Sequence, residues 1–259
     1  MINIKSPQEI ECMRKSGAIL RDCLLYLEER VKPGVSTKKL DEFAYDFIKR
    51  HNSTPSFLGY GGFPGTICAS IDEVVVHGFP SERRLKEGEI IGVDCGLVYK
   101  GWQSDAARTF LIGDVSEEKR KLVQTTRESF FEGVKQFKDG GHLGDISHAI
   151  QVYCEDRGYG IVRSMTGHGI GKEMHENPGV PNYGRRGRGT HLVDGMALCI
   201  EPMVNAGGKA VYLARNGWAV HTADHSKAAH YELTVVVRKG CAEQLSTYDF
   251  IEKDGKINF

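Results

Sequence analysis

Four acidic residues stand in parts of the sequence that otherwise favour β-strands. Asp94 interrupts the apolar run EIIGVDCGLVY, Glu201 follows MALCI, and Glu232 opens ELTVVV. Asp105, at the start of another apolar run, completes the set. Acidic side chains are disfavoured in strands and are rarely buried unless they are paired or bind a metal. Each acid alone could end a strand in solvent, but four acids in similar positions indicate one shared site.

The spacing of Asp94 and Asp105 predicts that the two acids are neighbours. Residues 89–99 and 105–113 are predicted to be paired strands, and a turn centred just after Tyr99 would place the acids directly opposite each other. Opposed residues of an antiparallel pair have Cβ atoms roughly 4.5–5.5 Å apart, so two carboxylates there would repel. We therefore expect a positive group between them, either a divalent cation or an arginine.

A histidine, His168, joins the acids from the unusual fragment TGHGIGKEMHENPG at 166–179. The fragment carries a second histidine, His175, and the spacing alone leaves open whether both bind one metal. Four carboxylates with one imidazole differ from structural zinc sites, which favour Cys and His. Such a set is typical of a pair of divalent ions such as Mn, Fe(II), Co or Zn, which can share and deprotonate a bridging water.

These residues must be positioned by a mixture of helices and short strands. Ser6, Pro7 and Glu9 predict a capped helix that runs to about Arg30, where KPG ends it. Apolar spacing predicts a second helix that begins near Ser36. The other predicted elements are a loop at 52–65, strands at 66–70, 73–78, 89–99, 105–113, 194–205 and 231–240, and helices at 116–138 and 143–156.

The order of these elements indicates an internal repeat. Each half carries two helices, then an HG pair, then a β run preceded by an acidic residue and a glycine. In both halves an acid lies six residues after that glycine, as the pairs Gly88/Asp94 and Gly195/Glu201. A chance match is the alternative, whereas a true repeat would bring acids from two facing halves to one seam. Helices followed by antiparallel strands, twice, predict an α+β fold with helices outside a curved sheet.

Composition excludes several classes of function. The 259-residue chain is 26% charged and 40% hydrophobic with a formal net charge of zero, which argues against a nucleic-acid binder. Seven scattered cysteines without a C-x-x-C pair predict neither a disulfide framework nor a zinc finger, and they suit the cytoplasm. No apolar stretch resembles a signal peptide or reaches the length of a membrane span. The arginines Arg185, Arg186 and Arg188 are expected to lie in a solvated loop, or else to contact an anionic partner.

Seven short motifs follow one another along nearly the whole chain. They are VVVHGFP at 74–80, GVDCG at 92–96, SDAARTF at 104–110, GHGIG at 167–171, MHENP at 174–178, IEPMVN at 200–205 and HYELTVVV at 230–237. As a set they resemble the type I methionine aminopeptidases. The resemblance implies the pita-bread fold, with pseudo-symmetric halves at about 1–115 and 116–259 of a single catalytic domain, 1–259, and a dinuclear metal site. The implied ligands are Asp94, Asp105, His168, Glu201 and Glu232.

The same resemblance implies that two histidines, His77 and His175, are not ligands but lie beside the substrate. His175 would donate to the scissile carbonyl oxygen and His77 would contact the nitrogen side of the bond, because imidazole N–H groups can stabilise a developing oxyanion. Glu201 would bind metal and also carry a proton from the attacking water to the leaving amine. In its sequence context alone, a lone histidine such as His77 more often has a structural role.

The resemblance also implies a pocket for a methionine side chain, built from residues 57–68 and a later tryptophan. The matching residues are Tyr60, Phe63, Cys68 and Trp218. An apolar, polarizable lining suits a thioether. The alternative for this glycine-rich stretch is a core-packed or flexible surface loop.

Two residues depart from the common bacterial pattern of the resembled family. Phe57 stands where a cysteine is usual, and Met174 where a phenylalanine is usual. Both are expected to touch or flank the pocket and to change its shape. No zinc-binding or linker extension precedes the implied core, which predicts a short form of the enzyme.

We therefore predict a cytoplasmic, monomeric metallo-aminopeptidase that uses two divalent ions. It would remove the initiator methionine from nascent peptides near the ribosome when the second residue is small. One alternative is an Xaa-Pro aminopeptidase or dipeptidase of the same fold, although these usually carry a separate N-terminal domain. A non-catalytic pita-bread binding protein and a metal-free creatinase-like hydrolase are further alternatives, and the complete set of ligands argues against both.

Overall fold

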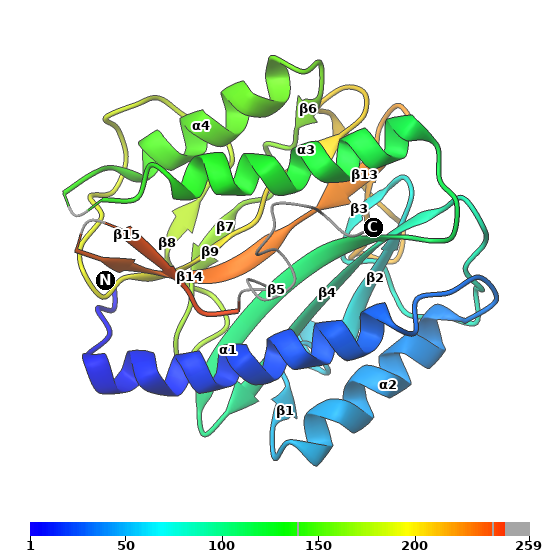
Figure 1. Ribbon diagram of the computed structural model, residues 1–259, viewed down its shortest axis with the longest axis horizontal. Helices are drawn as coiled ribbons and strands as arrows, with labels where there is room; N and C mark the ends of the chain where they lie inside the picture. Colours follow the sequence, from blue (N-terminus) through cyan, green and yellow to red (C-terminus); the bar gives the residue numbers. More distant parts are fainter. Residues whose placement is uncertain (139, 240, 247–259) are drawn as a thin grey trace.

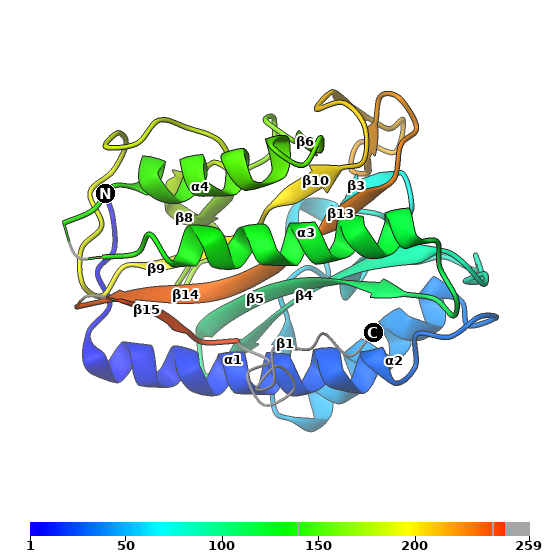
Figure 2. The ribbon, with the colours of Figure 1, turned by 45° about the horizontal axis from the view of Figure 1, so that its top comes forward.

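A curved antiparallel sheet forms the centre of the structure, and pairs of helices pack along it. The computed structural model describes residues 1–138, 140–239 and 241–246. The helices are α1 Pro7–Glu28, α2 Thr37–Arg50, α3 Glu117–Val134 and α4 Leu143–Glu155, with a 3₁₀ turn η1 at Tyr60–Gly62. Figures 1 and 2 show α1 and α2 along one half of the sheet and α3 and α4 along the other. The predicted α+β fold with outer helices is confirmed.

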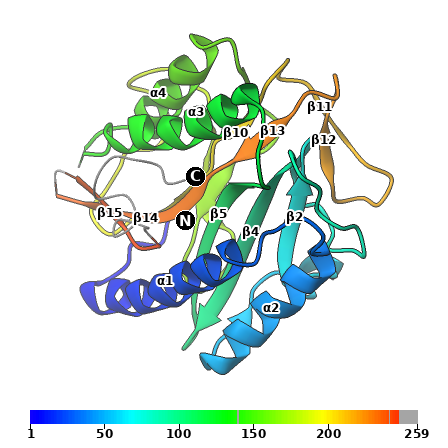
Figure 3. The same cartoon turned by 45° about the vertical axis from the view of Figure 1, so that its right-hand side comes forward.

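The strands of the described residues form three sheets, and every pairing is antiparallel. The strands are β1 Thr54–Pro55, β2 Ile67–Ile71, β3 Val74–Val76, β4 Ile90–Tyr99, β5 Trp102–Leu111, β6 Gly160–Ile161, β7 Gly167–Gly169, β8 Glu176–Val180, β9 Ala197–Ile200, β10 Met203–Asn205, β11 Val211–Leu213, β12 Val220–Thr222, β13 Ala228–His230, β14 Glu232–Arg238 and β15 Cys241–Gln244. The nine-stranded main sheet runs β1-β4-β5-β14-β9-β7-β8, with β2 also on β4 and β15 on β14. The small sheets are β13-β10-β6 and β11-β12-β3, and Figure 3 brings β11 and β12 forward.

The first helix begins where its capping signals predict. The Ser6 hydroxyl accepts from the Glu9 N–H, and the Glu9 carboxylate accepts from the Ser6 N–H at 2.8 Å. One face of α1 is buried, including Ile10, Leu20 and Leu24, and α1 packs on β4 and β5. Within the described part of the chain, no helix is long and apolar enough to cross a bilayer.

The pairing register of the β4–β5 hairpin differs from the prediction by two residues, because the turn lies one residue later in the chain. Lys100 and Gly101 form the two-residue turn, with φ of +50° and +81°, as the favoured hairpin turn requires. The turn is therefore centred after Lys100 and not after Tyr99, so Asp94 is opposite Ala107 and Asp105 is opposite Gly96. The acids face each other diagonally on one side of the sheet, each across from a residue with little or no side chain.

Several predicted boundaries also change. The glycine-rich stretch 166–179, for which no strand was predicted, contributes β7 and β8, paired with a bulge between His168 and Gly169. The strand predicted at 194–205 is two strands, β9 and β10, because Pro202 interrupts the ladder after Glu201. The helix predicted at 116–138 ends at Val134. Residue 240 of the strand predicted at 231–240, and 247–259 of the predicted second half, lie outside the described residues.

The internal repeat predicted from Gly88 and Gly195 is present in the structure. Both glycines have a left-handed φ, +82° and +88°. The Gly88 N–H donates to Ile112 O, and the Gly195 N–H donates to Val237 O, both at 2.9 Å. The β4–β5 pair of the first half therefore corresponds to the β9–β14 pair of the second. Pairing of β5 with β14 joins the two halves in one sheet.

Candidate metal centre and active site

Five neighbouring strands of the main sheet each position one of the predicted metal ligands. In sheet order these are Asp94 in β4, Asp105 in β5, Glu232 at the start of β14, Glu201 directly after β9, and His168 in β7. All five side chains line one cavity of about 110 Å³. The ladder therefore gathers residues that are more than one hundred positions apart in the sequence.

The distances within this group are too long for hydrogen bonds. His168 Nε2 lies 3.8 Å from Asp105 Oδ2 and 3.8 Å from Glu201 Oε1. Buried oxygens of three acids, Asp94 Oδ1, Asp105 Oδ1 and Glu232 Oε1, have no hydrogen-bond partner. An unpaired buried carboxylate oxygen is costly. The group therefore requires positive charge.

No lysine or arginine is among the described residues that line the cavity, so the arginine alternative is wrong. Burial raises the pKa of the Asp94 carboxyl to about 6. Burial, reinforced by the neighbouring carboxylates, raises the pKa values of Asp105, Glu201 and Glu232 well above their ordinary values. Divalent cations would relieve this repulsion and satisfy the unpartnered oxygens, so the residues fit a carboxylate-rich metal site.

The orientation and protonation of the His168 ring suit a nitrogen ligand. Its Nδ1–H donates to the carbonyl oxygen of Gly169 at 2.8 Å, which leaves the lone pair on Nε2 facing the carboxylates. Burial lowers the pKa of His168 to about 4, so the ring is neutral at physiological pH. A second ring nitrogen fixed by a backbone carbonyl is the usual arrangement of metal-binding histidines.

The backbones around the acids are also held by polar side chains. The Thr234 hydroxyl donates to Asp105 O at 2.8 Å and accepts from the Asp105 N–H at 3.1 Å. Asn182 Nδ2 donates to Glu201 O at 2.9 Å. Because these partners are buried, the acids keep their positions without help from solvent.

The predicted catalytic histidines, His77 and His175, lie on the rim of the same cavity. In the described residues, the imidazoles within 4 Å of Glu201 or Glu232 are His168 and His230, not these two. His175 Nδ1 lies 2.8 Å from the Tyr60 hydroxyl. Burial lowers the pKa of His175, and it lowers that of His77 to about 4. Both rings are thus neutral and able to donate one N–H.

His77 also has an unusual backbone conformation. Its φ is +60°, a left-handed conformation that costs free energy for residues other than glycine and that clusters at functional sites. The His77 ring lies edge-on to the Trp218 ring, with centroids 6.3 Å apart. The conformation turns the imidazole from the end of β3 into the cavity.

Aromatic rings form the other wall of the cavity. Phe63 is 2% exposed and makes edge contacts with the rings of Phe57, Phe79 and Trp218, with centroids 6.4, 5.3 and 5.2 Å away. Cys68 in β2 is directly opposite Asp94. Burial, with a contribution from Asp94, raises the pKa of the Cys68 thiol well above its ordinary value, so the wall remains uncharged.

The structure brings together all but one of the residues predicted for the site. The exception is Met174, which is buried with Phe57 in a separate apolar cluster and does not line the cavity. A Cβ atom added to Gly96 would lie 2.7 Å from Met174 Cε and 2.9 Å from Phe57 Cε1. The two atypical residues therefore pack together over Gly96, and Met174 supports the wall from behind.

Two residues of the site region were missed by the sequence analysis. Glu176 accepts from Lys5 Nζ at 2.5 Å and from the Lys172 N–H at 3.1 Å, and so anchors the segment that carries His175. His230 is buried beside the carboxylates. Its position two residues before Glu232 in extended backbone, hence on the same face, is the signal that could have found it.

Comparisons with known proteins agree with this geometry. Residues 11–239 match metallopeptidase family M24. The chain is 58% identical to the methionine aminopeptidase of Clostridium acetobutylicum, over 92% of this chain and 95% of that protein. It is 44% identical to methionine aminopeptidase 1 of Bacillus subtilis, over 92% of this chain and 96% of that protein.

Solved structures add a likeness of fold. The crystal structure of methionine aminopeptidase from Rickettsia prowazekii superposes with a TM-score of 0.94 at 39% identity, over 95% of this chain and all of that one. The prolidase of Pyrococcus furiosus superposes with a TM-score of 0.77 at 22% identity, and this chain covers 65% of it. The pita-bread fold of these proteins is thus shared by the present chain.

Proposed function

Since the chain belongs to metallopeptidase family M24, with methionine aminopeptidases as relatives over most of its length, we propose that it is a methionine aminopeptidase. It removes the initiator methionine from nascent peptides whose second residue is small. One observation carries the proposal: four buried carboxylates and an imidazole share a cavity with an aromatic wall. The centre suits hydrolysis, and the wall suits a thioether side chain.

The proposed ligands are the five residues that the strands gather, and they would hold two divalent ions. Ligand atoms of Asp105, His168, Cys199 and Glu232 lie within 4.8 Å of one another, as do those of Glu201, His230 and Glu232, so Glu232 belongs to both groups. When bound, such an ion pair lowers the pKa of a shared water and polarises a carbonyl. The carboxylate-rich set is compatible with Mn, Fe(II), Co and Zn.

The chain's own groups then orient the substrate and move the proton. Glu201 takes the proton of the attacking water and passes it to the leaving amine, as a carboxylate that lines the cavity can do. We assign the Tyr60 hydroxyl as the donor to His175 Nδ1, which leaves the proton on His175 Nε2 for the scissile carbonyl oxygen. His77, on the opposite rim beside Trp218, contacts the nitrogen side of the bond.

The methionine side chain enters the aromatic wall. Tyr60, Phe63, Cys68 and Trp218 line it together with Phe57. Sulfur–aromatic contacts and apolar burial favour the thioether over charged or branched polar side chains. Met174 acts through Phe57, because it packs behind that ring and not on the substrate.

The proposal extends to the organisation and setting of the chain. Residues 1–259 form one catalytic domain with halves at about 1–115 and 116–259, since β5 of the first half pairs with β14 of the second and joins both halves in one sheet. A monomer in the cytoplasm is compatible with seven cysteines that are all free. The substrates are nascent peptides near the ribosome. Arg185, Arg186 and Arg188 are exposed, which suits a solvated loop.

A peptide panel separates this function from its alternatives. The metal-free chain, and the chain with added Mn, Fe(II), Co or Zn, are incubated with Met-Ala-Ser, a Met-Pro peptide and Xaa-Pro peptides. We expect metal-dependent release of methionine from Met-Ala-Ser. Preferential cleavage of Xaa-Pro bonds regardless of the first residue would favour a proline peptidase. Absence of cleavage with every metal would favour a binding protein.

A further inference from the structure

A second imidazole, that of His230, lies beside two carboxylates of the proposed metal centre. Its side chain is 3% exposed. His230 Nε2 lies 3.7 Å from Glu201 Oε2 and 3.9 Å from Glu232 Oε2. The same Nε2 has no hydrogen-bond partner. A buried nitrogen that is aimed at two carboxylates without bonding to either requires an explanation.

These distances point to co-ligation. They exceed the hydrogen-bond range. Two atoms bound to one ion at 2.0–2.2 Å are roughly 3.0–3.6 Å apart for bond angles of about 90–120°, and the observed separations are only slightly longer. The proposed ligand His168 shows similar spacing, with both of its carboxylate contacts at 3.8 Å. Glu201 thus turns one oxygen toward each imidazole.

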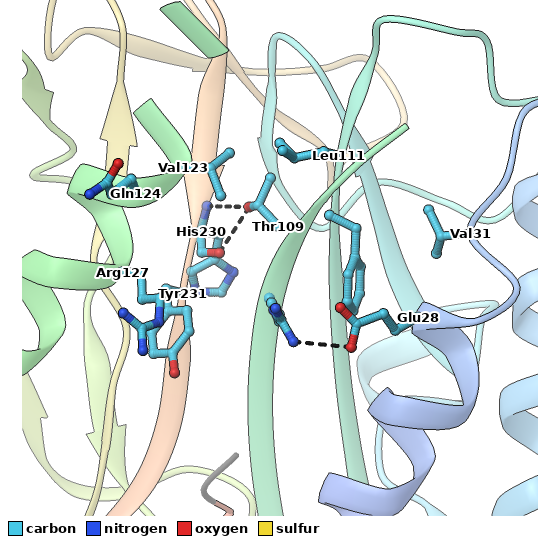
Figure 4. A pocket seen from close by; sticks show the side chains of 11 residues that line it. Glu28, Val31, Thr109, Leu111, Val123, Gln124, Arg127, His230 and Tyr231 are labelled. Atoms are coloured by element: carbon cyan, nitrogen blue, oxygen red, sulfur yellow. Dashed lines mark hydrogen bonds and ion pairs between the residues drawn. The ribbon is translucent and has the colours of Figure 1, made fainter. Parts of the chain in front are cut away.

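The backbone of His230 is fixed by two hydrogen bonds to one buried threonine. The Thr109 hydroxyl donates to His230 O and accepts from its N–H, both at 2.9 Å, as Figure 4 shows. His230 also lines a cavity of about 200 Å³ between α1, α3 and the sheet. It therefore lies between this cavity and the carboxylates, and Glu28 and Arg108 in the cavity are engaged with each other at 3.1 Å.

The charges around His230 favour a cation at this position. Asp94, Glu201 and Glu232 face the ring. The two nearest carboxylates, those of Glu201 and Glu232, are largely buried with the ring, and the lone pair of a neutral imidazole can bind a divalent cation.

We propose that His230 Nε2 is a nitrogen ligand of the second divalent ion, together with Glu201 and Glu232, so that each ion of the pair binds one imidazole. His168 would serve the first ion and His230 the second, with Glu232 shared. The inference rests on the proposed metal centre. Imidazole suits Co, Fe and Zn better than hard cations, so His230 would bias the second site toward those metals.

The most direct test counts the imidazole groups that are bound to metal in the native protein. The whole chain, with ¹⁵N-labelled histidine, is loaded with Co(II), and nitrogen ligands are counted by X-ray absorption and pulsed electron paramagnetic resonance. Two ions with one imidazole each are expected. Two ions with a single imidazole between them would overturn the role of His230 and leave the proposed function intact. If no Co(II) binds, both proposals fail.

A variant gives an independent result. In His230→Gln, calorimetric titration of Co(II) should show the second ion at least about tenfold weaker, with the first ion unchanged and one imidazole lost. The matched control His51→Gln makes the same change at an exposed histidine and should bind like wild type. Unchanged affinity and nitrogen count in His230→Gln would overturn the proposal. The labelling experiment on the native chain decides the question if the variant does not fold.

Discussion

The metal centre and the side-chain pocket share one cavity but are built in different ways. Each proposed ligand lies in a strand of the main sheet or next to one, so the ladder fixes five backbone positions together. The pocket instead uses a turn, η1, and the loop that carries Trp218, held by contacts between rings. Tyr60 in that turn is 47% exposed. Charges need accurate placement, whereas an apolar pocket needs mainly the right shape.

This difference predicts two kinds of failure. A change in the centre alters the charge balance, and so alters metal binding and the stability of the metal-free chain. A change in the wall removes contacts to the substrate and leaves the metal in place. The substitutions below test whether the two regions are separable in this way.

The largest effect is expected for Asp105→Asn. Removing one member of a group of buried, interacting charges costs about 3–5 kcal/mol. The rate of methionine release should therefore fall by roughly 10²–10³-fold or more, and the amount of bound metal should fall with it. The metal-free variant should nevertheless be more stable than wild type at neutral pH, because one repelling carboxylate is removed. Metal analysis, peptide assay and thermal unfolding measure the three quantities. Asp114→Asn, at a 93% exposed side chain, is the control.

The next effect should separate chemistry from metal binding. In His175→Ala the donor to the carbonyl oxygen is lost, and kcat should fall by about 10²–10³-fold. Metal content should stay at the wild-type level, opposite to Asp105→Asn. Equal loss of metal would show that His175 is a ligand and that the division between centre and rim is wrong.

The charge of the centre also predicts a pH dependence. The folded-state pKa of Asp94 is raised from 3.8 to about 6, so between these values the folded chain binds more protons than the unfolded chain. Its contribution to stability is therefore present at low pH and is lost as pH rises through about 6. Metal-free Asp94→Asn should gain in melting temperature over metal-free wild type across this window. A constant difference from pH 4 to pH 7 would contradict the account.

A smaller effect is expected in the wall. Trp218→Leu removes ring contacts worth about 1 kcal/mol, so KM for Met-Ala-Ser should rise about fivefold with little change in kcat or metal content. Tyr212→Leu changes an exposed aromatic residue outside the cavity and should leave both constants unchanged. Loss of metal from Trp218→Leu would mean that wall and centre are coupled.

The smallest effect concerns the contact between the two regions. Tyr60→Phe removes the hydroxyl that bonds to His175 Nδ1 at 2.8 Å. One hydrogen bond contributes about 1 kcal/mol, so kcat should fall about fivefold as the imidazole loses its fixed orientation. A change in KM alone would assign Tyr60 to the pocket and not to His175.

The sequence predicted the centre better than the elements that carry it. Asp94, Glu201 and Glu232 were visible because acids in apolar runs are rare. The strands β7 and β8 were not, since the glycine-rich stretch 166–179 lacks an alternating pattern. The predicted hairpin pairing was wrong by two residues because composition alone did not show that Lys100 and Gly101 are the turn.

The remaining misses concern packing between distant segments. Met174 was expected to touch or flank the pocket, and the sequence did not show that it only flanks it, because its contact with Phe57 over Gly96 depends on three-dimensional proximity. His230 was overlooked because its relation to Glu201 depends on how β13 and β9 end beside each other. Its relation to Glu232, two residues along the chain, was open to sequence reasoning.

The central claim is that divalent ions at the carboxylate centre enable release of an N-terminal methionine. The most direct measurement titrates the metal-free chain with Co(II) while bound metal and methionine release from Met-Ala-Ser are followed in the same sample. We expect no release without metal, and activity that rises with occupancy and is complete by two ions per chain. Release that does not depend on metal, or two bound ions without release, would contradict the account.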